Sequence, residues 1–129
     1  METKSSEKFS PLEGLRVLDL SDEKGELCGR ILGDLGADVL KIESSIGSIS
    51  RSLGPFTEDG TSLYFAYRNL NKRSALIDFD SEEDIEKLLS VIKDSDVLIE
   101  TFLPGTLSEL GLSPEILMNV NPSLIIVSL

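Results

Sequence analysis

A strand–helix–strand unit near the beginning of the chain constrains the fold more than any other feature. Residues 15–20 (LRVLDL) form a compact apolar run that predicts a buried strand, and residues 38–43 (DVLKIE) predict a second one. Between them, residues 25–35 carry apolar side chains at helical spacing. Two strands joined by a short helix pair in parallel through a right-handed crossover. The sequence therefore predicts an α/β fold.

The helix over residues 25–35 has an unusual glycine content. Two sets of residues each recur every fourth position and form separate stripes: Gly25, Gly29 and Gly33, and Leu27, Ile31 and Leu35. An interior glycine costs a helix about 1 kcal/mol relative to alanine. Several of them in one helix indicate that a sheet, another helix or a ligand approaches closely. Gly36 fits a left-handed residue that ends the helix.

The remaining chain continues the alternation of strands and helices. Residues 75–80, 96–100 and 124–129 predict three further strands, residues 81–93 a helix capped by Ser81, and residues 62–68, 106–110 and 114–119 short helical segments. Residues 44–62 are rich in Ser and Gly and aperiodic, which predicts a surface loop. Residues 1–10 are dominated by polar side chains and predict a disordered leader.

Composition excludes several classes of function. With 12 Lys+Arg against 23 Asp+Glu the net charge is −11, which argues against binding to nucleic acid. The chain has no His for an imidazole base, and its single Cys, Cys28, supports neither a disulfide framework nor a multi-thiolate metal site. We expect Cys28 to pack as a small residue. No apolar run approaches the roughly 20 residues that span a bilayer, and no signal peptide is evident, so we expect a cytoplasmic protein.

In an open parallel sheet, ligands bind beyond the carboxyl ends of the strands. That rule selects residues 21–25, residues 44–51, Asp80 and residues 101–103, although ordinary solvated loops are the alternative interpretation. The glycine fingerprint of dinucleotide sites, the phosphate-binding P-loop and the nucleophile elbow of serine hydrolases are all absent.

The basic residues Arg68, Lys72 and Arg73 form the only concentration of positive charge in the chain. They could attract a phosphate-bearing ligand or pair with the many acidic side chains nearby, and the sequence leaves both interpretations open.

Six segments together resemble the family III CoA-transferases. They are residues 11–21 (PLEGLRVLDLS), 29–43 (GRILGDLGADVLKIE), 51 with 54–56 (Arg and GPF), 63–79 (LYFAYRNLNKRSALIDF), 95–112 (SDVLIETFLPGTLSELGL) and 121–128 (NPSLIIVS). The resemblance implies a Rossmann-like parallel sheet with flanking helices, of which residues 11–129 are the N-terminal portion. It also implies transfer of CoA between carboxylic acids through intermediates on one aspartate, in intertwined homo- or heterodimers.

The resemblance also implies a site and a substrate. CoA or acyl-CoA is a substrate rather than a permanently bound cofactor, and no metal is involved. The contacts to its adenine and pantetheine parts fall on Glu23, Lys24, Ser44, Ile77, Asp78, Phe79, Asp80, Thr101 and Phe102. Phe102 matches an aromatic residue of the family, and an aromatic face can stack on adenine. Three positions depart from the family: Ser44 and Glu109 replace Arg, and Asp80 replaces Lys.

The family's nucleophilic aspartate lies downstream of residues 121–128, so the resemblance implies no catalytic residue within this chain. The chain also ends inside an apolar run, which predicts that it is the front part of something longer. Two further hypotheses remain: a non-catalytic partner subunit of a two-component or tandem transferase, and a free-standing α/β module for an unrelated nucleotide. The missing phosphate motifs argue against the last.

Overall fold

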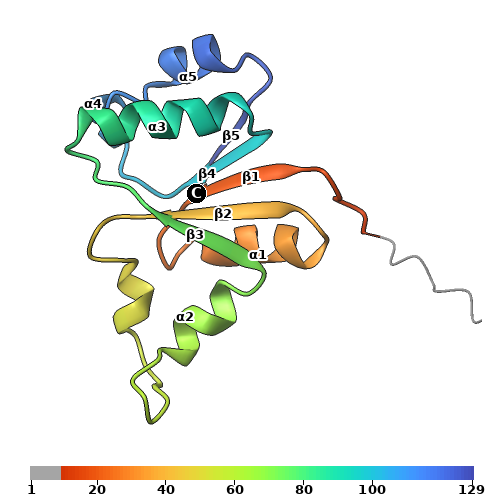
Figure 1. Cartoon of the computed structure of the whole chain (residues 1–129), viewed down its shortest axis with the longest axis vertical. Coiled ribbons are helices and arrows are strands. Elements are labelled where there is room, and N and C mark those ends of the chain that lie inside the picture. Colours follow the sequence, from red (N-terminus) through yellow and green to blue (C-terminus); the bar gives the residue numbers. More distant parts are fainter. Residues whose placement is uncertain (1–9) are drawn as a thin grey trace, which may run out of the picture.

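A five-stranded parallel sheet forms the centre of the structure, a computed structural model that describes residues 10–129 (Figure 1). The predicted leader therefore lies outside the described residues, apart from Ser10. The elements in chain order are β1 (Arg16–Leu20), α1 (Glu26–Asp34), β2 (Asp38–Glu43), the 3₁₀ helix η1 (Ile49–Ser52), α2 (Leu63–Arg68), β3 (Lys72–Leu76), α3 (Glu82–Lys93), β4 (Val97–Glu100), α4 (Thr106–Glu109), α5 (Pro114–Val120) and β5 (Ile125–Ser128).

The strands lie in the order β3-β2-β1-β4-β5, and every neighbouring pair is parallel. In Figure 1, α3, α4 and α5 lie on one side of the sheet and α1 on the other. This arrangement confirms the predicted α/β fold. The order also brings the carboxyl ends of β1, β2 and β4 together at one edge, where ligands of such sheets bind.

The glycine stripe of α1 faces the sheet. A Cβ atom on Gly29 would lie 2.6 Å from Asp19 Oδ2 of β1, and one on Gly33 would lie 3.2 Å from the backbone oxygen of Asn71. The close approach predicted for these glycines is therefore confirmed. Gly36 follows the helix with a φ of +104°, as predicted for its end. The apolar stripe of the same helix remains open to solvent, and its side chains Leu27, Ile31 and Leu35 are 38%, 51% and 42% exposed.

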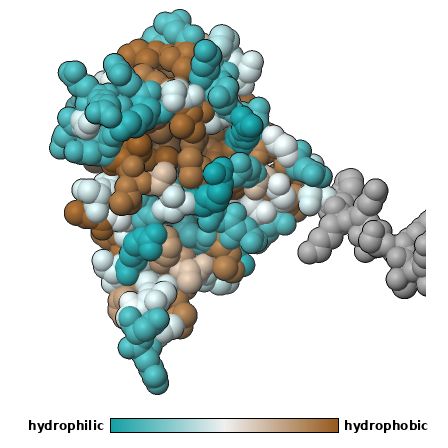
Figure 2. Space-filling view, viewed as in Figure 1, coloured by the Kyte–Doolittle hydropathy of each residue, from teal (hydrophilic) through white to brown (hydrophobic). Residues whose placement is uncertain are grey.

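The core lies mainly between the sheet and α3. Leu88 and Ile92 of α3 are fully buried against Leu18, Leu98 and their neighbours, which confirms the predicted apolar face. Ser81 caps this helix by accepting a hydrogen bond from the backbone N–H of Asp84, as predicted. A smaller cluster, including the half-buried Cys28, lies under α1. Figure 2 shows hydrophobic surface in the middle of the molecule.

One prediction about local structure was wrong. The third strand runs over Lys72–Leu76 rather than residues 75–80. It is an edge strand whose polar side chains pair with partners on β1, β2 and α1, so its position does not follow the apolar residues that the prediction relied on. Residues 44–62 form a mostly exposed loop, as predicted, and this loop carries the short η1 and an isolated bridge between Phe56 and Ser62.

A candidate ligand cleft at the carboxyl edge of the sheet

A cleft of about 240 Å³ opens where β1, β2 and β4 end. We call it the carboxyl-edge cleft. Its lining residues are Leu20, Ser21, Asp22, Lys41, Ile42, Glu43, Ser44, Gly47, Ser48, Ile49, Phe79, Thr101 and Phe102. They come from the loop after β1, from the end of β2 and the loop that follows it, from the segment after β3, and from the turn after β4. The structure therefore assembles a cleft where the general rule for parallel sheets predicts a ligand.

Four of the residues predicted to contact a ligand line this cleft: Ser44, Phe79, Thr101 and Phe102. The rings of Phe79 and Phe102 meet edge to face, with centroids 6.1 Å apart. The hydroxyl of Thr101 accepts a 2.8 Å hydrogen bond from the backbone N–H of Asp22, which joins the loops after β1 and β4. The aromatic pair supplies an apolar surface beside polar loops, a combination suited to a ligand with both characters.

The other five predicted residues do not line the cleft. Ile77 is buried in the core, while Asp78 and Asp80 are exposed. Lys24 is also exposed, and its ammonium lies 3.4 Å from Asp22. The backbone oxygen of Glu23 accepts a 2.9 Å hydrogen bond from Arg68.

A second hollow beside Phe79 is strongly acidic. It has a volume of about 370 Å³ and is lined by Phe79, Asp80, Glu82, Ile85, Glu86, Glu109, Leu110 and Gly111. Asp80 and Glu109, for which the resemblance predicts departures from the family, thus face the same space. Four carboxylates around one hollow repel a phosphate group at neutral pH.

The basic residues Arg68, Lys72 and Arg73 each contact a different partner within the fold. Lys72 is buried, with its ammonium 2.5 Å from Asp19 Oδ2. Arg73 forms a bidentate pair with Asp38 at the amino end of β2. Together with the Arg68 bond to a backbone oxygen, these contacts favour the interpretation that the cations pair within the fold.

Two buried carboxylates were not singled out from the sequence: Glu43, which lines the cleft, and Glu26, which lies behind its lining. The guanidinium of Arg51 donates to both oxygens of Glu43, at 2.7 and 2.8 Å, and Glu26 lies 3.0 Å from the ammonium of Lys41. The signal was available, because Lys41 and Glu43 interrupt a strand predicted to be buried, where charges need partners.

Hydrogen bonds keep both carboxylates charged. The side-chain bonds from Arg51 outweigh the effect of burial and lower the pKa of Glu43 to about 2. Burial alone would raise the pKa of Glu26, but the hydroxyl of Ser50 and the charge of Lys41 hold that pKa below its ordinary value. Both groups are therefore anionic at neutral pH and serve as fixed acceptors for their neighbours.

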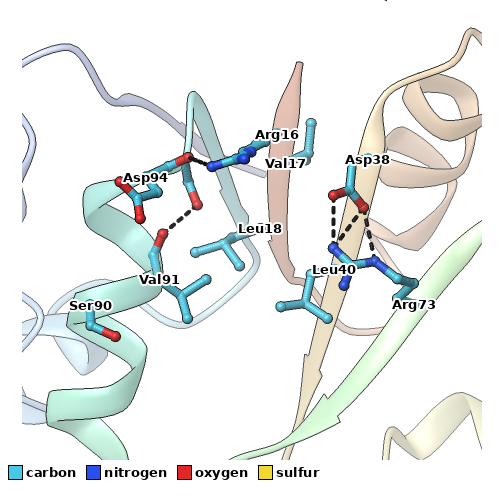
Figure 3. A pocket seen from close by; sticks show the side chains of 10 residues that line it. Arg16, Val17, Leu18, Asp38, Leu40, Arg73, Ser90, Val91 and Asp94 are labelled. Carbon is cyan, nitrogen blue, oxygen red and sulfur yellow. Dashed lines mark hydrogen bonds and ion pairs between the residues drawn. The ribbon is translucent and has the colours of Figure 1, made fainter. Parts of the chain in front are cut away.

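A further hollow, of about 320 Å³, lies at the opposite edge of the sheet (Figure 3). Leu18 and Leu40 line it from the strands and Val91 from α3, with the Arg73–Asp38 pair at its rim. None of the predicted ligand residues lies there. Over residues 10–129, no group of His, Cys, Asp or Glu side chains is arranged to hold a metal ion, and no helix is long and apolar enough to cross a membrane.

Comparison with known proteins identifies the class. The model of CoA-transferase family III matches residues 12–129. The chain belongs to this family, as the resemblance indicated.

Individual relatives agree with that membership. The chain is 37% identical to the probable fatty acyl-CoA transferase Rv3272 of Mycobacterium tuberculosis, covering 94% of this chain and 32% of that protein. It is 38% identical to formyl-CoA:oxalate CoA-transferase of Afipia carboxidovorans, covering 92% and 28%. A crystal structure of a CaiB/BaiF family protein from Brucella suis superposes with a TM-score of 0.87 at 40% identity, covering 94% and 33%. The chain thus spans about a third of the length of these relatives.

Proposed function

We propose that this chain binds the CoA part of an acyl-CoA in the carboxyl-edge cleft and acts as one segment of a family III CoA-transferase. The observation that carries the proposal is the meeting of Ser44, Phe79, Thr101 and Phe102 in one cleft. These residues are far apart in the sequence and occupy positions that the family resemblance assigns to CoA. The aromatic pair offers a surface for adenine, and the polar loops offer donors and acceptors for pantetheine.

The proposed division of labour follows from the state of the carboxylates in the cleft. Transfer of CoA through an aspartyl intermediate requires a carboxylate that is free to attack a thioester. Glu43 is held by Arg51 on both oxygens, and Asp22 lies beside Lys24. Neither is placed as a free nucleophile. We therefore infer that the residues lining the cleft bind and orient the thioester. The attacking aspartate and the site for the carboxylic acid then lie in another part of the transferase, which we propose to be a dimer in the cytoplasm.

The acidic hollow makes the proposed binding weak. Asp80 and Glu109 stand where other members of the family carry cations, so the phosphates of CoA meet negative charge beside Phe79. At 4 Å each unit charge changes the interaction by about 4 kcal/mol at an effective dielectric constant of 20, an upper limit for exposed groups. The acidic lining of this hollow is also the observation that favours the alternative function, a non-catalytic subunit paired with a second transferase chain.

A calorimetric titration with CoA tests the proposal. We expect a dissociation constant in the micromolar range or weaker, and a further loss of affinity in Phe102→Ala, which removes the aromatic surface from the cleft. Phe56→Ala is the matched control, because that ring is half exposed and outside the cleft. A sub-micromolar constant would contradict the role given to the acidic hollow. Equal affinities for Phe102→Ala and the unaltered chain would contradict the role given to the cleft.

A further inference from the structure

We propose that the Glu26–Lys41 ion pair, with Ser48 and Ser50, is a positioning unit that holds three walls of the carboxyl-edge cleft in their ligand-binding arrangement. The proposal rests on the proposed function. It assigns a role to buried groups that neither the sequence pattern nor the family resemblance singled out. Glu26 does not line the cleft, so it acts through the residues that it holds.

Lys41 joins the first two walls. Its side chain is almost fully buried in β2, and its ammonium donates a 2.8 Å hydrogen bond to the backbone oxygen of Ser21, in the loop after β1. The same ammonium lies 3.0 Å from Oε1 of Glu26, the first residue of α1. The loop between β1 and α1 is therefore tied to β2 near both of its ends.

Glu26 joins the third wall. Its Oε1 accepts hydrogen bonds from the hydroxyls of Ser48, at 2.8 Å, and Ser50, at 2.7 Å. Ser48 is held a second time, because its backbone N–H donates to Glu43 Oε2 at 2.8 Å. The segment that carries Ser48 into the cleft is thus fixed by two buried carboxylates, one at the end of β2 and one on α1.

The energetics favour positioning over bulk stabilisation. A buried ion pair often contributes little net stability, since the loss of hydration offsets the attraction between the charges. Its geometric effect remains, because each charge requires its partner at a fixed place. Oε2 of Glu26 is buried and has no hydrogen-bond partner within residues 10–129. The group is therefore not optimised for stability alone, and a cleft that keeps its shape without ligand binds with a smaller ordering cost.

The test removes the two hydroxyls and leaves the charges in place. We expect Ser48→Ala with Ser50→Ala to weaken CoA binding on the order of tenfold, through the loss of preorganisation, in a chain that remains folded with a lower unfolding midpoint, because the buried Glu26 carboxylate loses two donors. We also expect faster hydrogen exchange at the backbone amides of residues 47–51. Ser48→Thr retains the hydroxyl and should keep the affinity of the unaltered chain. The control, Arg73→Gln, breaks the pair with Asp38 at the opposite edge (Figure 3) and should leave the CoA affinity and the exchange at residues 47–51 unchanged.

The outcomes separate this inference from the proposed function. If the unaltered chain binds CoA and the double variant binds it equally well, the positioning role is wrong. If the unaltered chain does not bind CoA, the proposed function is wrong, and the exchange measurement alone decides whether the unit holds the loop. Unchanged exchange at residues 47–51 in the double variant overturns the inference in either case.

Discussion

Gly29 of α1 is a position at which one added methyl group would collide directly with a buried ion pair. A Cβ atom there would lie 2.6 Å from Oδ2 of Asp19, 3.1 Å from its Cγ and 3.2 Å from Cε of Lys72. The Asp19 carboxylate cannot move away at little cost. It is fully buried, paired with the ammonium of Lys72 and hydrogen-bonded to the backbone N–H of Ser21 at 3.0 Å. Gly29→Ala therefore forces either the helix away from the sheet or the ion pair apart.

The expected magnitude follows from three effects. Alanine improves helix propensity by about 1 kcal/mol. Overpacking costs about 1–3 kcal/mol, and complete loss of a buried pair costs about 3–5 kcal/mol. Partial movement of the helix and the pair leaves a net decrease of about 2 kcal/mol in the free energy of unfolding. Because Ala is the better helix former, propensity alone predicts a change of the opposite sign.

Urea denaturation followed by circular dichroism measures this change. Gly33→Ala is the matched control, since its Cβ would meet the backbone oxygen of Asn71 at 3.2 Å and side-chain atoms only at 3.5 Å. We expect the control to remain within about 1 kcal/mol of the unaltered chain, because gained propensity and mild crowding offset each other. A Gly29→Ala chain as stable as the unaltered one, or more stable, would refute the reasoning about the buried pair.

Three further predictions concern charge and activity. Replacing Asp80 with Lys and Glu109 with Arg should tighten CoA binding at least about tenfold at low salt and less at high salt, as calorimetry at two ionic strengths would show. Because the pKa of Glu43 falls from 4.5 to about 2 on folding, its contribution to the free energy of unfolding is present above pH 4.5 and is lost as the pH falls toward 2. Acid titrations of stability should show a smaller loss over that range in Arg51→Gln than in the unaltered chain, and identical stability profiles would contradict the pairing of Glu43 with Arg51. The chain alone should transfer no CoA from succinyl-CoA or formyl-CoA, and turnover above background would place the nucleophile within it.

The regular elements could be predicted because their signals are local. The spacing of Leu88 and Ile92 identifies a buried helical face, and Ser81 and Ser113 mark helix starts that the structure confirms. The edge strand could not be located in this way. The position of β3 depends on the ion pairs of Lys72 with Asp19 and of Arg73 with Asp38. These pairs join residues that are distant in the sequence.

The candidate site was predictable only in part. The carboxyl-edge rule locates the cleft, and the family resemblance selects Phe79 and Phe102 within it. The buried carboxylates that hold the loops could not be predicted in this way, because in the sequence Glu26 looks like an ordinary acidic residue at the start of a helix. Its role as an acceptor for Ser48 and Ser50 depends on how the loop after β2 folds back over α1.

The most direct measurement is a titration of the isotopically labelled chain with CoA, followed residue by residue through its backbone amide resonances. If the cleft is the site, the resonances of Ser44, Thr101 and Phe102 shift in a saturable manner, while those of Arg16 and Val91, beside the hollow at the far edge, stay in place. Shifts confined to the far edge, or no saturable shift at all, would contradict the assignment.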